Sequence, residues 1–261
     1  MKSFHGVARK MNNLLLTCEH GSRRIPRRYN RLGLTKRELD GAKDLHDVGA
    51  LDLMKEMARL SRASYLYTTQ SRLVIDCNRQ INGVKKAKNT FHASALKQTL
   101  LTEIDGEEKI IPVPGNALKS KREERSRFAH FAQPYQEHGK MIAEKICAQH
   151  GHACIVQIHS FYPLYNGEER KTDIGILYNQ SSHMAHKLIN ALREQTSLRI
   201  DANKPWDFRS PNVQGGAFYP LEKSKEIDIV VIEMNMKHLR TRTNQKKIAR
   251  LLCRSIKATT A

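Results

Sequence analysis

Side chains that could bind a metal or move protons recur just after short apolar runs of the sequence. These residues are Glu19, His20, Asp76, Asn78, Arg79, His159, Ser160 and Glu233. If each apolar run is a strand of one parallel sheet, its carboxyl end is where ligands of α/β proteins bind. We therefore expect two imidazoles, several carboxylates and an arginine to converge on one crevice.

This set of side chains suits metal-assisted hydrolysis. Two imidazoles and one carboxylate can hold a catalytic zinc ion with one coordination position left open. Zinc lowers the pKa of a bound water to about 7, and a nearby carboxylate can carry the water's proton to a leaving amine. An arginine can grip a substrate carboxylate through two hydrogen bonds. The predicted activity is hydrolysis of an amide or peptide bond in a small acidic substrate.

Each residue taken alone also fits a structural role. His20 could cap the loop that follows it, and His159 could be a hydrogen-bonded core histidine. Asp47 lies in a predicted helix with two other aspartates, which is typical of a solvated acidic face. Glu233 follows a run of β-branched residues, where a carboxylate is costly to bury without partners. The residue pattern therefore leaves a metal site and ordinary structural roles both open.

The composition is that of a globular protein whose cysteines are reduced. Of its 261 residues, 39% are hydrophobic and 27% are charged, and the length suits one large α/β domain or two small ones. The five cysteines are scattered and odd in number, which predicts free thiols and a cytoplasmic location. No apolar run approaches the roughly 18 residues of a membrane span, and the basic N-terminus lacks the apolar core of a secretory signal.

The formal net charge of +19 has two interpretations. It could attract nucleic acid, an anionic membrane or an anionic substrate, or it could reflect a generally basic surface. The basic residues are spread along the chain, with local concentrations only at residues 23–31 and 237–254. This spread favours the second interpretation, although an anionic substrate would also be attracted to a positive cleft.

Apolar runs alternate with amphipathic stretches, which predicts βαβ units and a largely parallel sheet. The expected strands are residues 14–18, 64–69, 72–75, 154–158, 173–178 and 227–232. The expected helices are residues 45–60, 127–149 with a kink near Pro134, 181–193 and 244–256. Residues 80–126 and 201–220 are predicted loops that could form the walls of a cleft.

Ordered short motifs extend this picture over nearly the whole chain. They include Thr17-Cys18-Glu19-His20-Gly21-Ser22, His46-Asp47-Val48-Gly49-Ala50, Arg72-Leu73-Val74-Ile75-Asp76-Cys77-Asn78-Arg79, Ile158-His159-Ser160, Gly215-Gly216 and Ile232-Glu233-Met234-Asn235. In this order, from residue 14 to residue 239, the sequence resembles the N-formylglutamate amidohydrolase family. The resemblance implies a three-layer α/β fold like that of zinc exopeptidases, with a mixed, mostly parallel central sheet and helices on both faces. We expect one domain at residues 11–258, preceded by a basic extension at residues 1–10.

The resemblance also implies roles for individual residues. His20 and His159 would be zinc ligands, and Glu233 would be the general base. The acidic ligand that zinc carboxypeptidases place three residues after the first histidine is replaced here by Arg23. Asp47 is therefore the expected third ligand, with Asp44 and Glu19 as alternatives. Arg72 would assist catalysis, and the residues expected to bind substrate are Asn78, Arg79, Ser160, Gly215, Gly216 and Asn235.

The expected function is a hydrolase using one zinc ion, although other divalent metals are possible. It would remove a formyl or other small acyl group from an N-acylated, acidic amino acid such as N-formylglutamate. Two alternatives remain: a small carboxypeptidase-like peptidase, and a basic, catalytically silent protein that binds polyanions or nucleic acid on the same fold. The expected partner is a small anionic substrate rather than a membrane or nucleic acid, because no aromatic stacking stripe is visible.

Overall fold

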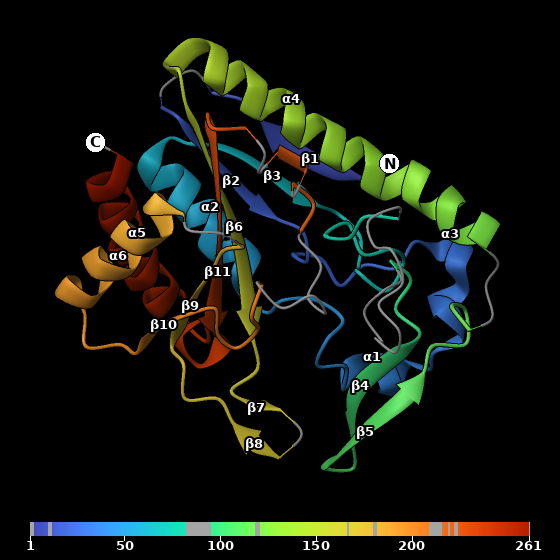
Figure 1. Cartoon of the computed structure of the whole chain (residues 1–261). Coiled ribbons are helices and arrows are strands. Elements are labelled where there is room, and N and C mark those ends of the chain that lie inside the picture. Colours follow the sequence, from blue (N-terminus) through green and yellow to red (C-terminus); the bar gives the residue numbers. More distant parts are fainter. Residues whose placement is uncertain are drawn as a thin grey trace.

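A mixed, mostly parallel sheet forms the centre of the computed structural model, which describes residues 3–9, 12–81, 95–117, 121–165, 167–179, 182–208, 216–218, 220–221 and 224–260 (Figure 1). Within these residues its strand order is β1-β3-β2-β6-β11-β9-β10. The strands are β1 (Phe4–Val7), β2 (Leu14–Cys18), β3 (Ser64–Thr68), β6 (Ala153–Phe161), β9 (Ile174–Leu177), β10 (Ile200–Ala202) and β11 (Ile227–Asn235). Only the pairs β1–β3 and β9–β11 are antiparallel.

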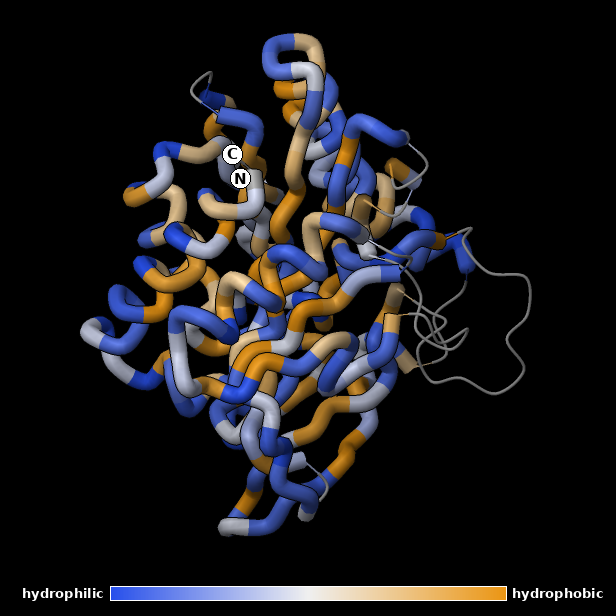
Figure 2. The backbone as a smooth tube through the Cα atoms, turned by 60° about the vertical axis from the view of Figure 1, so that its left-hand side comes forward, coloured by the Kyte–Doolittle hydropathy of each residue, from blue (hydrophilic) through white to orange (hydrophobic). Residues whose placement is uncertain are grey.

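Helices cover both faces of this sheet. Three helices lie on one face: α2 (Ala50–Ser61), α5 (His183–Gln195) and α6 (Arg242–Thr260). The long helix α4 (Gln133–His150) lies on the other face (Figure 1). Because successive strand residues point to opposite faces, Leu14 and Leu16 join the core beneath α2, whereas Leu15 joins the core beneath α4. The predicted three-layer α/β fold is confirmed, and the apolar residues concentrate in its middle layer (Figure 2).

A smaller apolar cluster lies beside the sheet. It includes Leu32, Leu45, Leu73 and Leu100. Its elements are η1 (Arg27–Gly33), α1 (Lys36–Asp40) and the hairpin of β4 (Thr99–Ile104) with β5 (Glu107–Pro112). A second hairpin pairs β7 (Leu164–Tyr165) with β8 (Glu168–Glu169), and the short helices are α3 (Lys121–Arg127), η2 (Phe128–Ala132) and η4 (Met236–His238).

Most predicted elements are present, with three corrections. Residues 72–75 do not form a strand, because Leu73 lies in a turn. The Ser71 hydroxyl accepts a hydrogen bond from Leu73 N, and the Ser71 carbonyl accepts one from Val74 N. The helix predicted over residues 45–60 begins only at Ala50. The loop predicted over residues 80–126 contains the β4–β5 hairpin and α3, with residues 82–94 and 118–120 outside the described part of the chain.

The predicted N-terminal extension and the predicted long helix differ in detail from expectation. The predicted extension at residues 1–10 contains β1, an edge strand that pairs with β3. The helix predicted from residue 127 starts earlier, and a π-helical turn at Phe128–Ala132 separates α3 from α4 just before Pro134. Among the described helices, none is both long and apolar enough to cross a membrane.

Candidate metal centre

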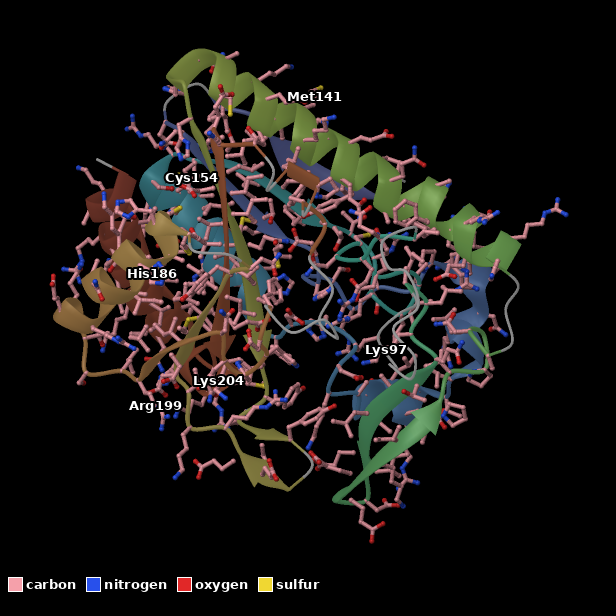
Figure 3. All side chains as sticks on the ribbon, in the orientation of Figure 1. Lys97, Met141, Cys154, His186, Arg199 and Lys204 are labelled. Carbon is pink, nitrogen blue, oxygen red and sulfur yellow. The ribbon has the colours of Figure 1, made fainter. Side chains whose placement is uncertain are left out.

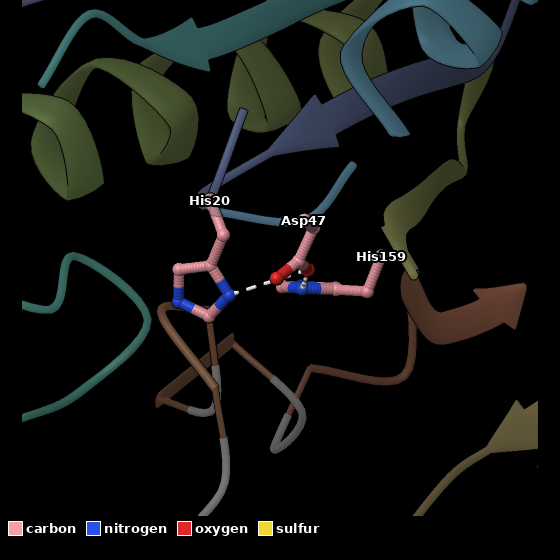
Figure 4. Close-up of side chains that lie close together, drawn as sticks. All are labelled: His20, Asp47 and His159. Carbon is pink, nitrogen blue, oxygen red and sulfur yellow. Dashed lines mark hydrogen bonds and ion pairs between the residues drawn. The ribbon is translucent and has the colours of Figure 1, made fainter. Parts of the chain in front are cut away.

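His20, Asp47 and His159 come together at the carboxyl end of the central strands (Figure 4). His20 follows β2, His159 lies in β6, and Asp47 lies in the segment between β2 and α2. Asp47 Oδ2 is 2.7 Å from His159 Nδ1 and 3.5 Å from His20 Nδ1. The two imidazole rings are 4.7 Å apart between centroids, and all three side chains are buried.

The backbone around Asp47 explains how this carboxylate reaches the histidines. Asp47 N donates to the carbonyl of His20, and the amide of Ser160 donates to Asp47 Oδ2. Gly49 has a positive φ of 78°, where a Cβ would also lie 2.7 Å from Leu239, so glycine is required before α2 begins. Asp47 therefore precedes the helix instead of lying in its middle, and its side chain is held by two strands.

Each imidazole has a second carboxylate on its other nitrogen. His20 Nε2 lies 2.8 Å from Asp76 Oδ1, and His159 Nε2 lies 3.0 Å from Glu19 Oε2. Both rings thus turn Nδ1 toward Asp47 and Nε2 toward a buried acid. Histidines that ligate metals commonly have their second nitrogen fixed by a carboxylate in this way, which sets the tautomer and the ring orientation.

Asp76 is held by a network of donors. Its Oδ1 accepts from Asn78 N at 2.9 Å, and its Oδ2 accepts from Arg72 at 2.8 Å and lies 3.8 Å from Arg79 Nε. Burial opposes ionisation, but the charges of His20 and Arg72 outweigh it and hold the pKa of Asp76 well below its usual range. Asp76 is therefore a permanent anion facing His20.

Glu19 occupies the corresponding position beside His159. Its Oε1 accepts a 2.8 Å hydrogen bond from the fully buried Tyr135 hydroxyl of α4. Burial opposes ionisation of Glu19, but the hydrogen bond and charge of His159, together with hydrogen bonds from Thr17 and Tyr135, outweigh burial and lower the pKa of Glu19. Burial and the Glu19 charge together raise the pKa of Tyr135. The phenol therefore stays protonated and donates a hydrogen bond to the carboxylate.

His159 and Asp47, which are 2.7 Å apart, shift each other's pKa. Burial disfavours charge on both, yet the hydrogen bonds that His159 donates to Asp47 and Glu19 raise the pKa of His159 well above its usual value. The charge of His20 and the hydrogen bond from His159 in turn hold the pKa of Asp47 far below its usual range, against burial. When no cation is bound, the raised pKa of His159 keeps a proton on this imidazole between the carboxylates of Asp47 and Glu19.

Glu233 lies beside His159 in the neighbouring strand. Their Cα atoms are register partners in the parallel pair β6–β11. Glu233 is buried, and its Oε2 has no hydrogen-bond partner among the described residues. Burial, with the charge of Asp47 adding, raises the pKa of Glu233 to about 8 against the opposing charges of His159, Arg72 and Arg170. A carboxyl group of this kind can both accept and return a proton near neutral pH.

The donor set fits a metal ion. The three candidate ligand atoms all lie within 4.8 Å of one another. Ligand atoms bound about 2.0–2.2 Å from a tetrahedral zinc are about 3.3–3.6 Å apart. The 3.5 Å separation of His20 Nδ1 and Asp47 Oδ2 has this value, and His20 Nδ1 has no hydrogen bond although it is buried. His20, Asp47 and His159 can therefore bind a metal.

The alternative acidic ligands lie elsewhere or serve another purpose. Asp44 forms an ion pair with Lys97 and accepts a hydrogen bond from Leu101 N, near the β4–β5 hairpin. Glu19, the other alternative, contacts His159 on the nitrogen that faces away from Asp47. Figure 3 shows Lys97 on the hairpin side of the molecule, away from the strand ends.

Several predicted substrate-binding residues lie around this centre. Asn78 Nδ2 is 3.5 Å from His159 Nε2, and Asn78 Oδ1 accepts from Gln157 and from Ala217 N. A Cβ on Gly216 would lie 2.5 Å from Asn78 Oδ1, so only glycine fits there. Gly215 lies outside the described residues.

The remaining predicted residues differ in how close they come. Arg72 reaches the centre, with its NH1 3.8 Å from Asp47 Oδ1, and Arg79 approaches Asp76. Ser160 donates its hydroxyl to the carbonyl of Val48 and thereby supports the Asp47 segment. The Asn235 side chain is fully buried and donates to the carbonyls preceding and following Lys171. The structure therefore does not bring the Asn235 amide to the histidines.

Sequence reasoning placed Asp76 among the polar residues of the expected crevice without predicting its contact with His20, gave Tyr135 no role and named Glu19 as an alternative ligand. For Glu19 a signal existed in the alternation of the strand. Glu19 points to the same side of the chain as Leu15, and Leu15 packs in the cluster that contains Tyr135 of α4. For Asp76 no local signal existed, because its contact with His20 spans 56 positions of the chain and depends on a turn that resembled a strand.

Comparison with known proteins places these features in a family. A family model described as N-formylglutamate amidohydrolase matches residues 12–238. A gene product of Agrobacterium tumefaciens has a similar structure, with a TM-score of 0.83, 26% identity, and coverage of 99% of this chain and 95% of its own. An N-formylglutamate amidohydrolase from Ralstonia eutropha shares the fold with a TM-score of 0.68 and 15% identity, covering 98% of each chain. Comparison with curated proteins gives no match.

The family match spans the segments that carry His20, Asp47, His159 and Glu233. The mixed, mostly parallel central sheet is the fold shared with the structure from Ralstonia eutropha. This chain belongs to the N-formylglutamate amidohydrolase family.

Proposed function

We propose that this protein is a zinc-dependent amide hydrolase that removes a formyl or other small acyl group from an N-acylated amino acid. One observation carries the proposal: His20 and His159 both direct Nδ1 at Asp47 while a buried acid fixes Nε2 of each ring. Asp76 and Glu19 thus orient both rings. A metal centre needs ligands oriented in this way, whereas a structural ion pair does not.

Zinc is the metal that this donor set favours. Two imidazoles and one carboxylate, with room for a fourth ligand, are typical of catalytic zinc sites. Bound zinc would supply a polarised water near neutral pH and a Lewis acid for the scissile carbonyl. His20, Asp47 and His159 would hold the ion, and their burial would keep bulk water from competing for it.

Glu233 is the proposed general base. Its backbone position beside His159 is fixed by strand register, and its Oε2 has no other hydrogen-bond partner among the described residues. A cation held beside it favours the ionised carboxylate, which offsets the burial that raises the pKa of Glu233. Glu233 would accept the proton of the attacking water and return it to the leaving amine.

Arg72, Asn78 and Arg79 are the proposed contacts for the substrate. Arg72 lies within 3.8 Å of Asp47 and so flanks the proposed metal, whereas Asn78 lies 3.5 Å from His159 Nε2, on the side of the ring that faces Glu19. Their positive charge and amide group suit a carboxylate and a carbonyl, respectively. These contacts support an N-acyl amino acid with a free α-carboxylate, and an acidic side chain such as that of glutamate adds a second anionic group. Gly215, Gly216 and Ser160 remain secondary candidates for binding.

Formate release from N-formylated amino acids tests this proposal. The chain is stripped of metal with a chelator, reloaded with Zn²⁺, and assayed with N-formylglutamate, N-formylleucine, N-acetylglutamate and a dipeptide ending in glutamate. We expect activity only after reloading and a preference for the N-formyl acidic substrate. Faster cleavage of the dipeptide would instead indicate a small carboxypeptidase-like peptidase.

Substitution of the base separates hydrolysis from binding. Glu233→Gln should lower kcat by about 10²–10⁴-fold while zinc content stays unchanged. Glu169→Gln on the exposed hairpin strand β8 is the matched control and should keep wild-type activity. Activity that survives both chelation and Glu233→Gln would contradict the proposal.

The polyanion-binding alternative has one observation in its favour. The exposed face of α6 carries Arg242, Lys246, Lys247, Arg250, Arg254 and Lys257. None of them forms an ion pair within the part of the chain that the structure describes, and α6 contains no acidic residue. Anisotropy of a labelled single-stranded oligonucleotide tests this alternative. Tight binding that weakens steeply with salt would support it, and weak, salt-insensitive binding would exclude it.

A further inference from the structure

A second group of metal-binding side chains lies at the opposite end of the central sheet. His152 precedes β6, Cys154 is the second residue of β6, and Asp228 is the second residue of β11. Cys154 and Asp228 are register partners in the parallel pair β6–β11, so their side chains leave the same face. His159 comes five residues after Cys154 in β6, about 16 Å along the strand, so this group is separate from the candidate catalytic centre.

We propose that His152, Cys154 and Asp228 form a second metal site, for zinc or a divalent cation of similar softness. Their ligand atoms all lie within 4.8 Å of one another. A thiolate, an imidazole and a carboxylate together are a donor set that suits zinc better than magnesium or calcium, which prefer oxygen alone.

The two separations at His152 Nε2 lie close to those of tetrahedral coordination. His152 Nε2 lies 3.6 Å from Cys154 Sγ and 3.1 Å from Asp228 Oδ2. With bonds of about 2.3 Å to sulfur and about 2.0–2.2 Å to nitrogen and oxygen, a tetrahedral ion sets these separations near 3.6 Å and 3.4 Å. A small outward movement of the one-third exposed Asp228 side chain would complete the fit.

Hydrogen bonding alone leaves the group in conflict. If His152 Nε2 carries a hydrogen, it donates to Asp228 and cannot accept from the Cys154 thiol. If Nε2 is bare, it accepts from the thiol and its lone pair faces the Asp228 carboxylate at 3.1 Å. A cation at the common point removes the conflict, because all three groups then direct lone pairs at it.

The surroundings of Cys154 agree with this assignment. Cys154 is 2% exposed, whereas His152 and Asp228 are about one-third exposed and give an ion a route from solvent. The Asn13 side-chain Nδ2 is the donor nearest the sulfur, 4.0 Å from Cys154 Sγ. A cation here would join the starts of two central strands and stabilise the folded chain by binding it preferentially.

Cobalt substitution tests the site independently of hydrolysis. The full chain is stripped of metal and titrated with Co²⁺ alone, and the sulfur-to-cobalt charge-transfer absorption is recorded. The candidate catalytic centre offers nitrogen and oxygen only, so this absorption reports the second site. We expect two Co²⁺ ions per chain and a charge-transfer band in the wild type.

Matched variants decide the outcome. Cys154→Ser should abolish the band, whereas Cys147→Ser should keep it, because Cys147 packs against the other core cluster and contacts the Glu226 carbonyl. His152→Asn changes a partly exposed side chain and serves if Cys154→Ser fails to fold. It should weaken Co²⁺ binding by more than the roughly 10–100-fold that outer ligand partners contribute. A wild type without the band, or a band that persists in both Cys154→Ser and His152→Asn, would overturn the proposal.

Discussion

His159 of β6 and Glu233 of β11 are direct register partners, and the side chains of both leave the sheet toward α4. Parallel pairing thus places an imidazole and a carboxyl group side by side without any contribution from loop conformation. A slip of one residue in either strand would send one of the two side chains to the opposite face, among the residues packed under α2. The separation of the proposed ligand from the proposed base is therefore as rigid as the sheet.

Removing one imidazole should remove the metal. We expect His20→Asn to lose the catalytic zinc and, with it, formate release, because His20 supplies one of three proposed ligands. Metal content per chain after gel filtration in zinc buffer measures this. His183→Asn, at the exposed start of α5, is the matched control and should retain both metal and activity. Equal metal content in the two variants would exclude His20 as a ligand.

The carboxylate behind His20 should matter nearly as much as a ligand. Asp76→Asn keeps the shape of the side chain but removes the charge that orients His20 through a 2.8 Å contact. Zinc affinity should fall by about 10–100-fold, as measured by competition with a chromophoric chelator. Asp44→Asn is the control, since Asp44 pairs with Lys97 and not with a histidine. If Asp44→Asn weakened zinc binding and Asp76→Asn did not, the assignment of these two acids would be reversed.

The hydroxyl of Tyr135 should stabilise the folded chain through Glu19. Tyr135→Phe leaves one oxygen of a fully buried carboxylate without its 2.8 Å donor. The free energy of unfolding should fall by about 1–3 kcal/mol, measured by urea titration of the metal-free protein. Tyr67→Phe serves as control, because the Tyr67 hydroxyl makes no hydrogen bond within the described part of the chain. A loss of equal size in both variants would show that the Glu19 contact adds nothing.

Acid should weaken the fold partly through Asp173. Burial opposes its ionisation, but hydrogen bonds from His238, Lys237 and Arg199 N lower the pKa of Asp173 to about 2. Since the folded pKa lies below the usual value near 3.8, the stabilisation is complete above about pH 4 and is lost as the pH falls through about 2.

Comparison with Asp173→Asn isolates this contribution. Urea titrations at pH 6, 4 and 3 should show a wild-type advantage on the order of 1 kcal/mol that shrinks at the lowest pH. Asp201→Asn, which loses an ion pair with Arg199 on the same edge of the sheet, is the control for general charge loss. A difference between wild type and Asp173→Asn that stayed constant from pH 6 to pH 3 would contradict the prediction.

The segment around Asp76 shows where reading the sequence failed. Leu73, Val74 and Ile75 are apolar and fully buried, as in a strand, but they belong to two different clusters. A turn can bury consecutive residues when core lies on both sides of it, and only the fold supplies the second core. The pattern of burial was therefore predicted correctly, while the backbone conformation and the contact of Asp76 with His20 were not.

The sequence by itself determined a largely parallel α/β sheet and the candidates His20, His159 and Glu233, because side-chain alternation and strand ends are local properties of the chain. The three-layer arrangement was expected only from the family resemblance. The tertiary structure decided that Asp47, and not Asp44, faces the histidines, and that Glu19 and Asp76 stand behind them. These choices depend on contacts between segments 27 to 140 positions apart, whose approach is set by how the strands pack and pair. No local pattern encodes such distances.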